Sequence, residues 1–278
     1  MLVIDYQRLK FGCISNICID RYAFNERSDS ILSRLREIMS TDRRRKYRYL
    51  TDSCEHRGLV VNNKDNNLLI ERLDALNSLV ATAMGDHNSL LFYRFDLRLP
   101  QGLDVCTSDI TNRFIGKLKK RWDSSKRGKL HYIWCKERES AKGDHWHFGF
   151  VVDSKFTQPL GLAEMVDKSW CYAVQPQNYK RGLVERVGYE PNVSKHTGHI
   201  KIAEIVYWWS YLCKHRQGTE VSRGNFRTSR VNKDLKLELN LTEEQKEEAV
   251  QNNKKLIRRR HARTMKKKKE FTTFNGSK

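Results

Sequence analysis

The sequence contains no Cys-x-x-Cys pair, although seven cysteines are spread along its 278 residues. Zinc fingers and zinc ribbons hold their metal through closely spaced cysteines, so the sequence gives no support to either class. The odd number and wide separation of the cysteines also argue against a disulfide framework. These features predict reduced thiols and a cytoplasmic protein.

Long apolar runs are missing as well. No stretch of about 18 apolar residues is present, so a membrane-spanning helix is not expected. The first residues, MLVIDYQRLKFG, carry charges too early and too short an apolar run for a secretory signal peptide. Internal repeats are also absent. We therefore expect a protein without a membrane partner and without a repeat architecture.

Acidic residues are few relative to basic ones. The chain has 33 Asp plus Glu against 53 Lys plus Arg, which gives a formal net charge of +20 at pH 7. Such an excess favours a polyanionic partner, most simply nucleic acid. Six tryptophans and eleven tyrosines accompany the charge. Because aromatic rings can stack on the bases of single strands, we favour nucleic-acid binding over a merely solvated basic surface.

Three regions differ in their patterns. Residues 1–85 are predicted to be mostly helical, because SDSILSRLREIM and LLIERLDALNSLVATAM place apolar residues at helical spacing; this region has no recognisable role. Residues 86–232 hold the candidate catalytic domain. Residues 233–278 form a basic tail, where a capping box from Thr242 to Gln245 begins a helix. The tail is either a clamp on phosphates or a solubilising segment.

The central region alternates strand and helix patterns. SLLFYRFDLRLP predicts a half-buried strand ended by Pro100. A helix capped by Ser108 follows, and its apolar residues recur every four positions. KLHYIWCKERE and GDHWHFGFVV predict a β-hairpin. A helix at LGLAEMVDKSW and a strand at GLVERVGY complete the order, and the helix AEIVYWWSYLCKH closes the domain. This order predicts an α+β fold with an antiparallel sheet of ferredoxin-like or RRM-like (split βαβ) arrangement.

Two histidines stand one residue apart at the start of the strand GDHWHFGFVV. Alternate residues of a strand share a face, so His145 and His147 point one way while Trp146 and Phe148 point the other. Two imidazoles form a partial metal site, and three protein ligands are the usual minimum. The alternative is a polar sheet face whose imidazoles contact phosphates without a metal.

The preceding strand can supply the third ligand. If the hairpin is centred on Lys142, Glu137 lies opposite His147 and Glu139 lies opposite His145. Both carboxylates then share the histidine face, whereas a slip of one residue would remove both from it. Histidine and carboxylate ligands suit Mg²⁺ or Mn²⁺, and zinc is a further possibility.

A tyrosine-containing helix, VYWWSYLCKH, offers a nucleophile. Tyr207, Tyr211 and Lys214 are spaced by four and three residues, which places them on one face of a helix. Because the free phenol has a pKa of about 10, it needs cationic neighbours to ionise at neutral pH. The alternative is an amphipathic face that simply packs in the core.

The motifs His145-Trp146-His147 and Tyr211-Leu212-Cys213-Lys214 resemble those of the HUH superfamily of rolling-circle replication initiators. That superfamily has two histidines around a bulky residue on a strand, and then YxxK on a later helix. SYLCK followed by NFRTSR is similar to two narrower groups. These are the replication proteins of filamentous phages (inoviruses) and the prophage proteins of the YagK/YfjJ type. The resemblance covers about residues 89–232.

The resemblance implies a mechanism. Tyr211 attacks a phosphodiester of single-stranded or melted origin DNA, which forms a 5′-phosphotyrosine bond and leaves a 3′-hydroxyl to prime synthesis. The same site later rejoins the strand. Glu137 is the implied third metal ligand, Lys214 orients or neutralises the phosphate, and Tyr207 matches the second tyrosine of some relatives. The implied partners are origin DNA and a host helicase or polymerase in a bacterial cytoplasm.

Basic side chains of the first central helix, the NFRTSR segment and the tail are predicted to contact DNA. They are Lys119, Lys120, Arg121, Arg227, Arg230, Arg258, Arg259 and Arg260. Three other functions fit the sequence. The protein could be a non-catalytic DNA-binding regulator, an HUH transposase or relaxase, or a metal-dependent RNA-processing enzyme that cleaves without a covalent intermediate.

Overall fold

The computed structural model describes residues 47–262 with short gaps. The gaps are residues 52, 66, 101–102, 104–106, 140–142, 156–158, 181, 188–191, 195–197, 216–224, 256–257 and 260–261.

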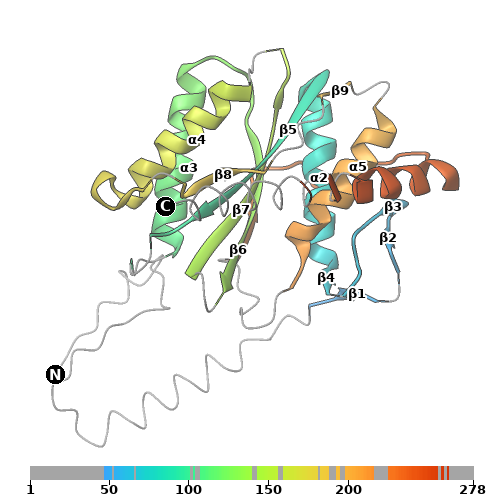
Figure 1. Ribbon diagram of the computed structural model, residues 1–278. Coiled ribbons are helices and arrows are strands. Elements are labelled where there is room, and N and C mark those ends of the chain that lie inside the picture. The colour runs from blue at the N-terminus through green and yellow to red at the C-terminus, as the bar shows by residue number, and fades with distance from the viewer. Residues whose placement is uncertain are drawn as a thin grey trace, which may run out of the picture. The chain divides into compact units, whose positions relative to one another are not determined.

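An antiparallel sheet lies at the centre of the domain (Figure 1). It consists of β5 (Ser89–Arg98), β6 (His131–Glu139), β7 (Gly143–Asp153), β8 (Val184–Arg186), β9 (Asn192–Ser194) and β10 (Phe226–Thr228). The strand order is β10-β6-β7-β5-β8, and β9 also pairs with β5. Because β7 lies between β5 and β6 and is antiparallel to both, β5 and β6 run parallel to each other.

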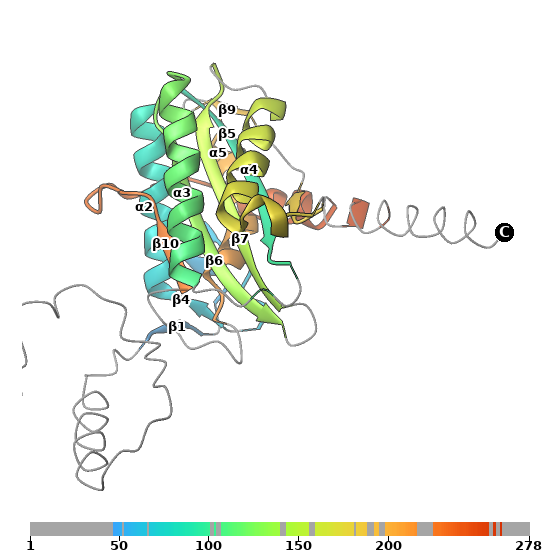
Figure 2. The same ribbon diagram turned by 90° about the vertical axis from the view of Figure 1, so that its left-hand side faces the viewer.

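Helices cover both faces of this sheet (Figures 1 and 2). On one face lie α3 (Thr107–Ser124) and α4 (Pro159–Val174). On the other lie α2 (Ile70–Asp86) and α5 (His199–Trp209). From β5 to β8 the chain runs strand, helix, strand, strand, helix, strand, as the sequence patterns predicted. The prediction of an α+β fold with an antiparallel sheet is confirmed.

The prediction that β5 is buried on only one face is wrong. Its residues Tyr93 and Phe95 pack beneath α3 and α4, as the alternation indicated. Its other face is covered as well, since Phe92 is fully buried and Arg94 is only 8% exposed. The covering side chains come from α2 and α5, for example Leu76 and Trp209, which share a core cluster with Phe92. Polar residues on that face therefore lie in a buried environment.

Gly149 of β7 makes the close approach of α5 possible. A Cβ atom at this position would lie 2.9 Å from the Trp209 ring and 3.0 Å from the Ile133 side chain. Real Cβ contacts are longer, and Trp209 is fully buried and cannot move outward without opening the core. Gly149 therefore seats the last residue of α5 directly on the sheet.

We expect Gly149→Ala to lower the free energy of unfolding by about 1–3 kcal/mol, the usual cost of overpacking a core. Urea unfolding followed by tryptophan fluorescence measures this change. Gly116→Ala is the matched control, because a Cβ atom there meets nothing within 4 Å in helix α3. Equal stability of the two variants would contradict the tight contact with Trp209.

Residues 47–69 form short strands, so the prediction of a mostly helical region is wrong for this part. The strands are β1 (Tyr49–Leu50), β2 (Glu55–His56), β3 (Leu59–Val60) and β4 (Leu68–Leu69). β1 pairs with β4, and both lie near one end of α2 in Figures 1 and 2. Leu59 and Leu68 belong to the same core cluster as Phe92, so the compact unit begins at Tyr47 rather than near residue 86. The expected helix at SDSILSRLREIM lies outside the described residues.

The predicted capping box is present. The Thr242 backbone N–H donates to Gln245 Oε1 at 3.0 Å, and the Gln245 N–H donates to Thr242 Oγ1 at 3.3 Å. The helix that follows covers residues 243–255. The preceding segment is packed rather than tail-like, because Leu237 and Leu239 join the core cluster of α2 and α5. The side chain of Asn77 also bonds both backbone groups of Leu237, at 2.6 and 3.3 Å.

Two buried histidines, His87 and His131, lie at the end of the sheet where β6 begins. His131 Nε2 lies 3.1 Å from Asp86 Oδ2, and the two imidazole rings are 5.5 Å apart. Burial lowers the pKa of His131 to about 4, although the Asp86 carboxylate acts in the opposite direction. His131 is therefore neutral in the folded protein at pH values where it is protonated in the unfolded chain.

This depressed pKa predicts acid sensitivity. As the pH falls from 6.5 to about 4, the unfolded state takes up the His131 proton and the folded state does not, so stability is lost across that window. The pKa difference sets an upper limit of about 3 kcal/mol for the loss. His131→Gln should lose less of its free energy of unfolding between pH 7 and pH 4.5 than the natural protein in urea titrations. Parallel losses would show that other groups cause the acid sensitivity.

Within the described part of the chain, no helix is both long and apolar enough to cross a bilayer.

Candidate metal site and nucleophile

The histidine pair lies near the start of β7, opposite the end of β6. The pairing register of these two strands decides which carboxylate lies beside the histidines. Glu137 pairs with His145, and Glu139 pairs with Gly143. The predicted register, with Glu137 opposite His147, is therefore wrong by two residues, because the hairpin is centred on residue 141. A shift of two keeps every side chain on its original face. Glu137 consequently remains on the histidine face.

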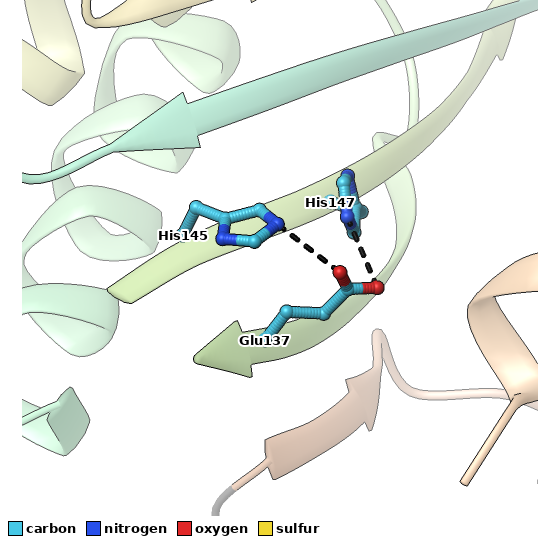
Figure 3. A group of neighbouring side chains, drawn as sticks. All are labelled: Glu137, His145 and His147. Carbon is cyan, nitrogen blue, oxygen red and sulfur yellow. Dashed lines mark hydrogen bonds and ion pairs between the residues drawn. The ribbon is translucent and has the colours of Figure 1, made fainter. Parts of the chain in front are cut away.

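The Glu137 carboxylate contacts both imidazoles (Figure 3). Glu137 Oε2 lies 3.1 Å from His145 Nε2, and Glu137 Oε1 lies 3.2 Å from His147 Nε2. All three residues are buried, with 2%, 8% and 5% exposure for Glu137, His145 and His147. Their ligand atoms lie close enough together to hold a metal ion. Among the described residues, no other group of three His, Cys, Asp or Glu side chains does so.

The donor atoms fit a divalent cation. One ligand atom from each residue can be chosen so that the three lie within 4.8 Å of one another, a spacing that could hold one ion. Two nitrogens and a carboxylate from one buried face suit Mn²⁺, Mg²⁺ or Zn²⁺. The predicted ligand set of Glu137, His145 and His147 is thus brought together, whereas Glu139 is paired further along the strand.

Asp96 and Arg94 of β5 support this group, although neither was predicted from the sequence to belong to the site. Asp96 Oδ1 lies 2.6 Å from His147 Nδ1 and 3.2 Å from Arg94 Nε. When the Nδ1–H of His147 donates to Asp96, the Nε2 lone pair of His147 is left to face Glu137 or a metal. The sequence pattern that could have identified them is the alternation in SLLFYRFDLRLP, which places Arg94 and Asp96 on the polar face of β5. In the paired sheet, this is the same face on which β7 carries its two histidines.

The pKa shifts of Asp96 and His147 agree with a hydrogen bond between the two side chains. Burial would raise the pKa of Asp96, but the hydrogen bond from His147 and the charge of Arg94 outweigh burial and lower it. Burial would also lower the pKa of His147, but hydrogen bonds to Asp96 and Glu137 outweigh it and raise that pKa. The face is thus a largely buried hydrogen-bonded network in which His147 lies between two carboxylates and Asp96 lies between His147 and the Arg94 guanidinium.

Tyr211 lies beside the histidine pair. Its ring centroid is 5.7 Å from that of His147, the Arg94 guanidinium lies 5.0 Å from it, and Lys214 Nζ lies 5.5 Å from it. The tyrosine is half-buried. The structure therefore brings Tyr211 to the HxH strand, with two cations beside its ring: Lys214 of the YxxK motif and Arg94, which the sequence patterns did not indicate.

The backbone that carries Tyr211 differs from the predicted helix. α5 ends at Trp209, and a 3-10 turn, η3 (Ser210–Cys213), follows. Lys214 then forms an isolated antiparallel bridge with Leu68 of β4, which ends the helical geometry. Tyr207, Tyr211 and Lys214 are therefore not on one face of a continuous α-helix.

Tyr207 has an environment unlike that of Tyr211. It is only 6% exposed, and burial raises its pKa. A raised pKa works against a phenol that must ionise to attack phosphorus. The structure therefore gives no support to a second nucleophile at this position.

The predicted DNA-binding residues fall into separate places. Lys119 and Lys120 are exposed on α3 and Arg121 is half-exposed there, so the sheet separates them from Tyr211. Arg227 lies on the edge strand β10 and Arg230 follows it, both exposed. Arg258 and Arg259 are exposed in helical backbone after the gap at residues 256–257, and Arg260 lies outside the described residues. The α3 residues do not contribute to the metal site.

Comparison with known families gives one match. The model of the YagK/YfjJ C-terminal domain family matches residues 51–229, which is more than half of the chain. The chain therefore belongs to this family, and the YagK/YfjJ part of the resemblance is confirmed. The matched stretch includes Glu137, both histidines, Tyr211 and Lys214. Neither the curated proteins nor the solved structures include a match to this chain.

Proposed function

We propose that this member of the YagK/YfjJ C-terminal domain family is an HUH-type replication initiator that nicks and rejoins single-stranded origin DNA. The observation that carries the proposal is the contact between the Tyr211 ring and His147, a residue of the three-ligand group. A nucleophile beside a metal site, in a protein of net charge +20, suits chemistry on a phosphodiester.

The metal would be held by Glu137, His145 and His147, with Mg²⁺ or Mn²⁺ as the expected ion. When bound, it supplies Lewis-acid polarisation of the scissile phosphate. The protein's own contribution is to keep the ligands in place. Asp96 fixes the His147 ring through Nδ1, and burial keeps bulk water from the carboxylate.

Tyr211 is the proposed nucleophile. Its phenolic oxygen forms a bond to phosphorus, its proton passes to solvent, and the phosphorus–O3′ bond breaks. The leaving O3′ takes a proton from water, so the products are a 5′-phosphotyrosine and a free 3′-hydroxyl. Lys214 and Arg94, both close to the Tyr211 ring, place positive charge where the phenolate and phosphate oxygens become negative. The reverse reaction rejoins the strand.

The sheet supports the finer fold assignment. Within β5 to β8 the order is β6-β7-β5-β8, with one hairpin strand inserted between two parallel strands. This is the arrangement of a split βαβ unit, and we propose that the domain is ferredoxin-like. The exposed cations of α3, β10 and the C-terminal helix would then hold the DNA backbone outside the reaction centre.

The proposal is tested by incubating the full chain and Mn²⁺ with radiolabelled circular single-stranded DNA that carries the phage or prophage origin. A labelled protein band that survives denaturation and disappears after protease treatment is expected. Cleavage without a labelled band would favour a metal-dependent nuclease that uses water. Binding without any cleavage would favour a non-catalytic DNA-binding regulator.

A further inference from the structure

The loop residues 62–65 and 67 lie against both ends of η3, the turn that carries Tyr211. At one end, the Asn62 backbone N–H donates to Ser210 Oγ at 2.9 Å. At the other end, the His215 N–H donates to the Asn67 carbonyl at 2.7 Å, and Leu68 forms its bridge with Lys214. The loop is therefore fixed on both sides of the proposed nucleophile.

Buried polar contacts also hold the interior of this loop. The side chain of Asn63 is 3% exposed and donates to the carbonyls of Leu50 and Ser53 at 2.7 and 2.8 Å. On the other side, Arg72 Nη1 donates to the Lys214 carbonyl at 2.9 Å. The backbones of the loop and of Lys214 are thus positioned independently of any surface ion pair between them.

Asp65 lies in the middle of this loop, and its carboxylate reaches the lysine of the YxxK motif. Asp65 Oδ2 is 2.9 Å from Lys214 Nζ. The Lys214 side chain is only 11% exposed, whereas that of Asp65 is 62% exposed. The same ammonium lies 5.5 Å from the Tyr211 ring centroid. A carboxylate oxygen therefore occupies the solvent side of a cation that stands beside the nucleophile.

We propose that Asp65 occupies the phosphate subsite of Lys214, and that the DNA backbone must displace its carboxylate to bind there. The inference rests on the proposed function, because it takes the ligand to be a phosphodiester of single-stranded DNA. A carboxylate and a phosphodiester are both oxyanions and compete for one ammonium group. Stability does not explain the pair, since an ion pair with one partner as exposed as Asp65 contributes little to folding. Asp65 thus sets how readily the reaction site accepts a backbone phosphate.

The test uses Asp65→Asn, which removes the charge and keeps the size of the side chain. Binding of a fluorescein-labelled short oligothymidylate to the full chain is measured by anisotropy in EDTA, so that the metal does not contribute. The variant should bind about two- to fivefold more tightly, which is the range produced by one exposed ion pair. Glu164→Gln is the matched control. It gives the same change in net charge on α4, where Glu164 pairs with Lys168.

A double-mutant cycle assigns the effect to the subsite. In a Lys214→Met background, Asp65→Asn should bring no more gain than Glu164→Gln, because the competition has been removed. Three results would overturn the inference. These are weaker binding by Asp65→Asn, a gain equal to that of Glu164→Gln, or a gain that persists without Lys214.

The experiments can refute the nicking function and the competition at Lys214 independently of each other. If the natural protein forms the labelled covalent product but Asp65→Asn behaves like Glu164→Gln, only the competition at Lys214 is wrong. If no covalent product forms but the cycle shows coupling between Asp65 and Lys214, the phosphate subsite stands and the nicking function is wrong.

Discussion

Replacing Tyr211 with phenylalanine should abolish the covalent protein–DNA product while leaving DNA binding nearly unchanged. The substitution removes one oxygen, and the ring contacts with His147, Arg94 and Lys214 depend on the aromatic ring rather than on the hydroxyl. Loss of a nucleophile typically lowers the rate of the chemical step by at least about a thousandfold. The measurement is the rate of labelled-adduct formation with circular single-stranded DNA and Mn²⁺, with affinity measured separately by anisotropy.

Tyr207→Phe is the matched control for this experiment. Tyr207 lies on the last turns of α5, but it is buried and its pKa is raised by that burial. We expect this variant to form the adduct at close to the natural rate. A Tyr211→Phe protein that still forms the adduct would refute the assignment of the nucleophile, and loss of the adduct in Tyr207→Phe alone would transfer it to Tyr207.

Replacing Glu137 with glutamine should remove metal binding and, with it, nicking. The amide keeps the shape of the side chain but loses the negative charge that faces two imidazoles at 3.1 and 3.2 Å. Even residues that only support a metal ligand typically contribute 10- to 100-fold to metal affinity. For a ligand itself we expect a loss of about a hundredfold or more in Mn²⁺ affinity, measured by calorimetry or by electron paramagnetic resonance.

Glu139→Gln gives the matched control for Glu137→Gln. It makes the same chemical change on the same strand, at a residue that pairs with Gly143 rather than with either histidine. This variant should keep Mn²⁺ affinity and adduct formation. Equal losses in both variants would mean that the charge of the strand, rather than coordination by Glu137, controls metal binding.

Local patterns predicted the elements that depend on local geometry. The alternation in GDHWHFGFVV placed His145 and His147 on one face and Phe148 and Phe150 in the opposite core, and the structure agrees. The capping box at Thr242 is also correct, because a cap depends on residues only three positions apart. The predicted pairing register of β6 and β7 was wrong by two residues, because alternation of side chains excludes a shift of one residue but not a shift of two.

Packing between distant segments of the chain determined which residues support the candidate site. Arg94 and Asp96 lie on the side of β5 that the alternation predicted to face solvent, yet Arg94 packs against Trp208 of α5 and Tyr211 of η3, and Asp96 bonds His147. No sequence pattern predicted a role for Asp65, because its contact with Lys214 joins residues 149 positions apart. Such contacts follow from how helices and loops dock, which side-chain periodicity does not encode.

The amino-acid sequence alone determined the chemistry available here: two imidazoles on one strand face, an acidic residue on the neighbouring strand, a tyrosine followed by a lysine, and a strongly basic chain. These properties follow from residue type and from the short repeat distances of strands and helices. Only the tertiary structure decided that these groups meet. Gly149 lets Trp209 rest on the sheet, α5 ends there, and η3 turns Tyr211 toward His147. That meeting depends on close packing between distant segments, which is a property of the folded chain as a whole.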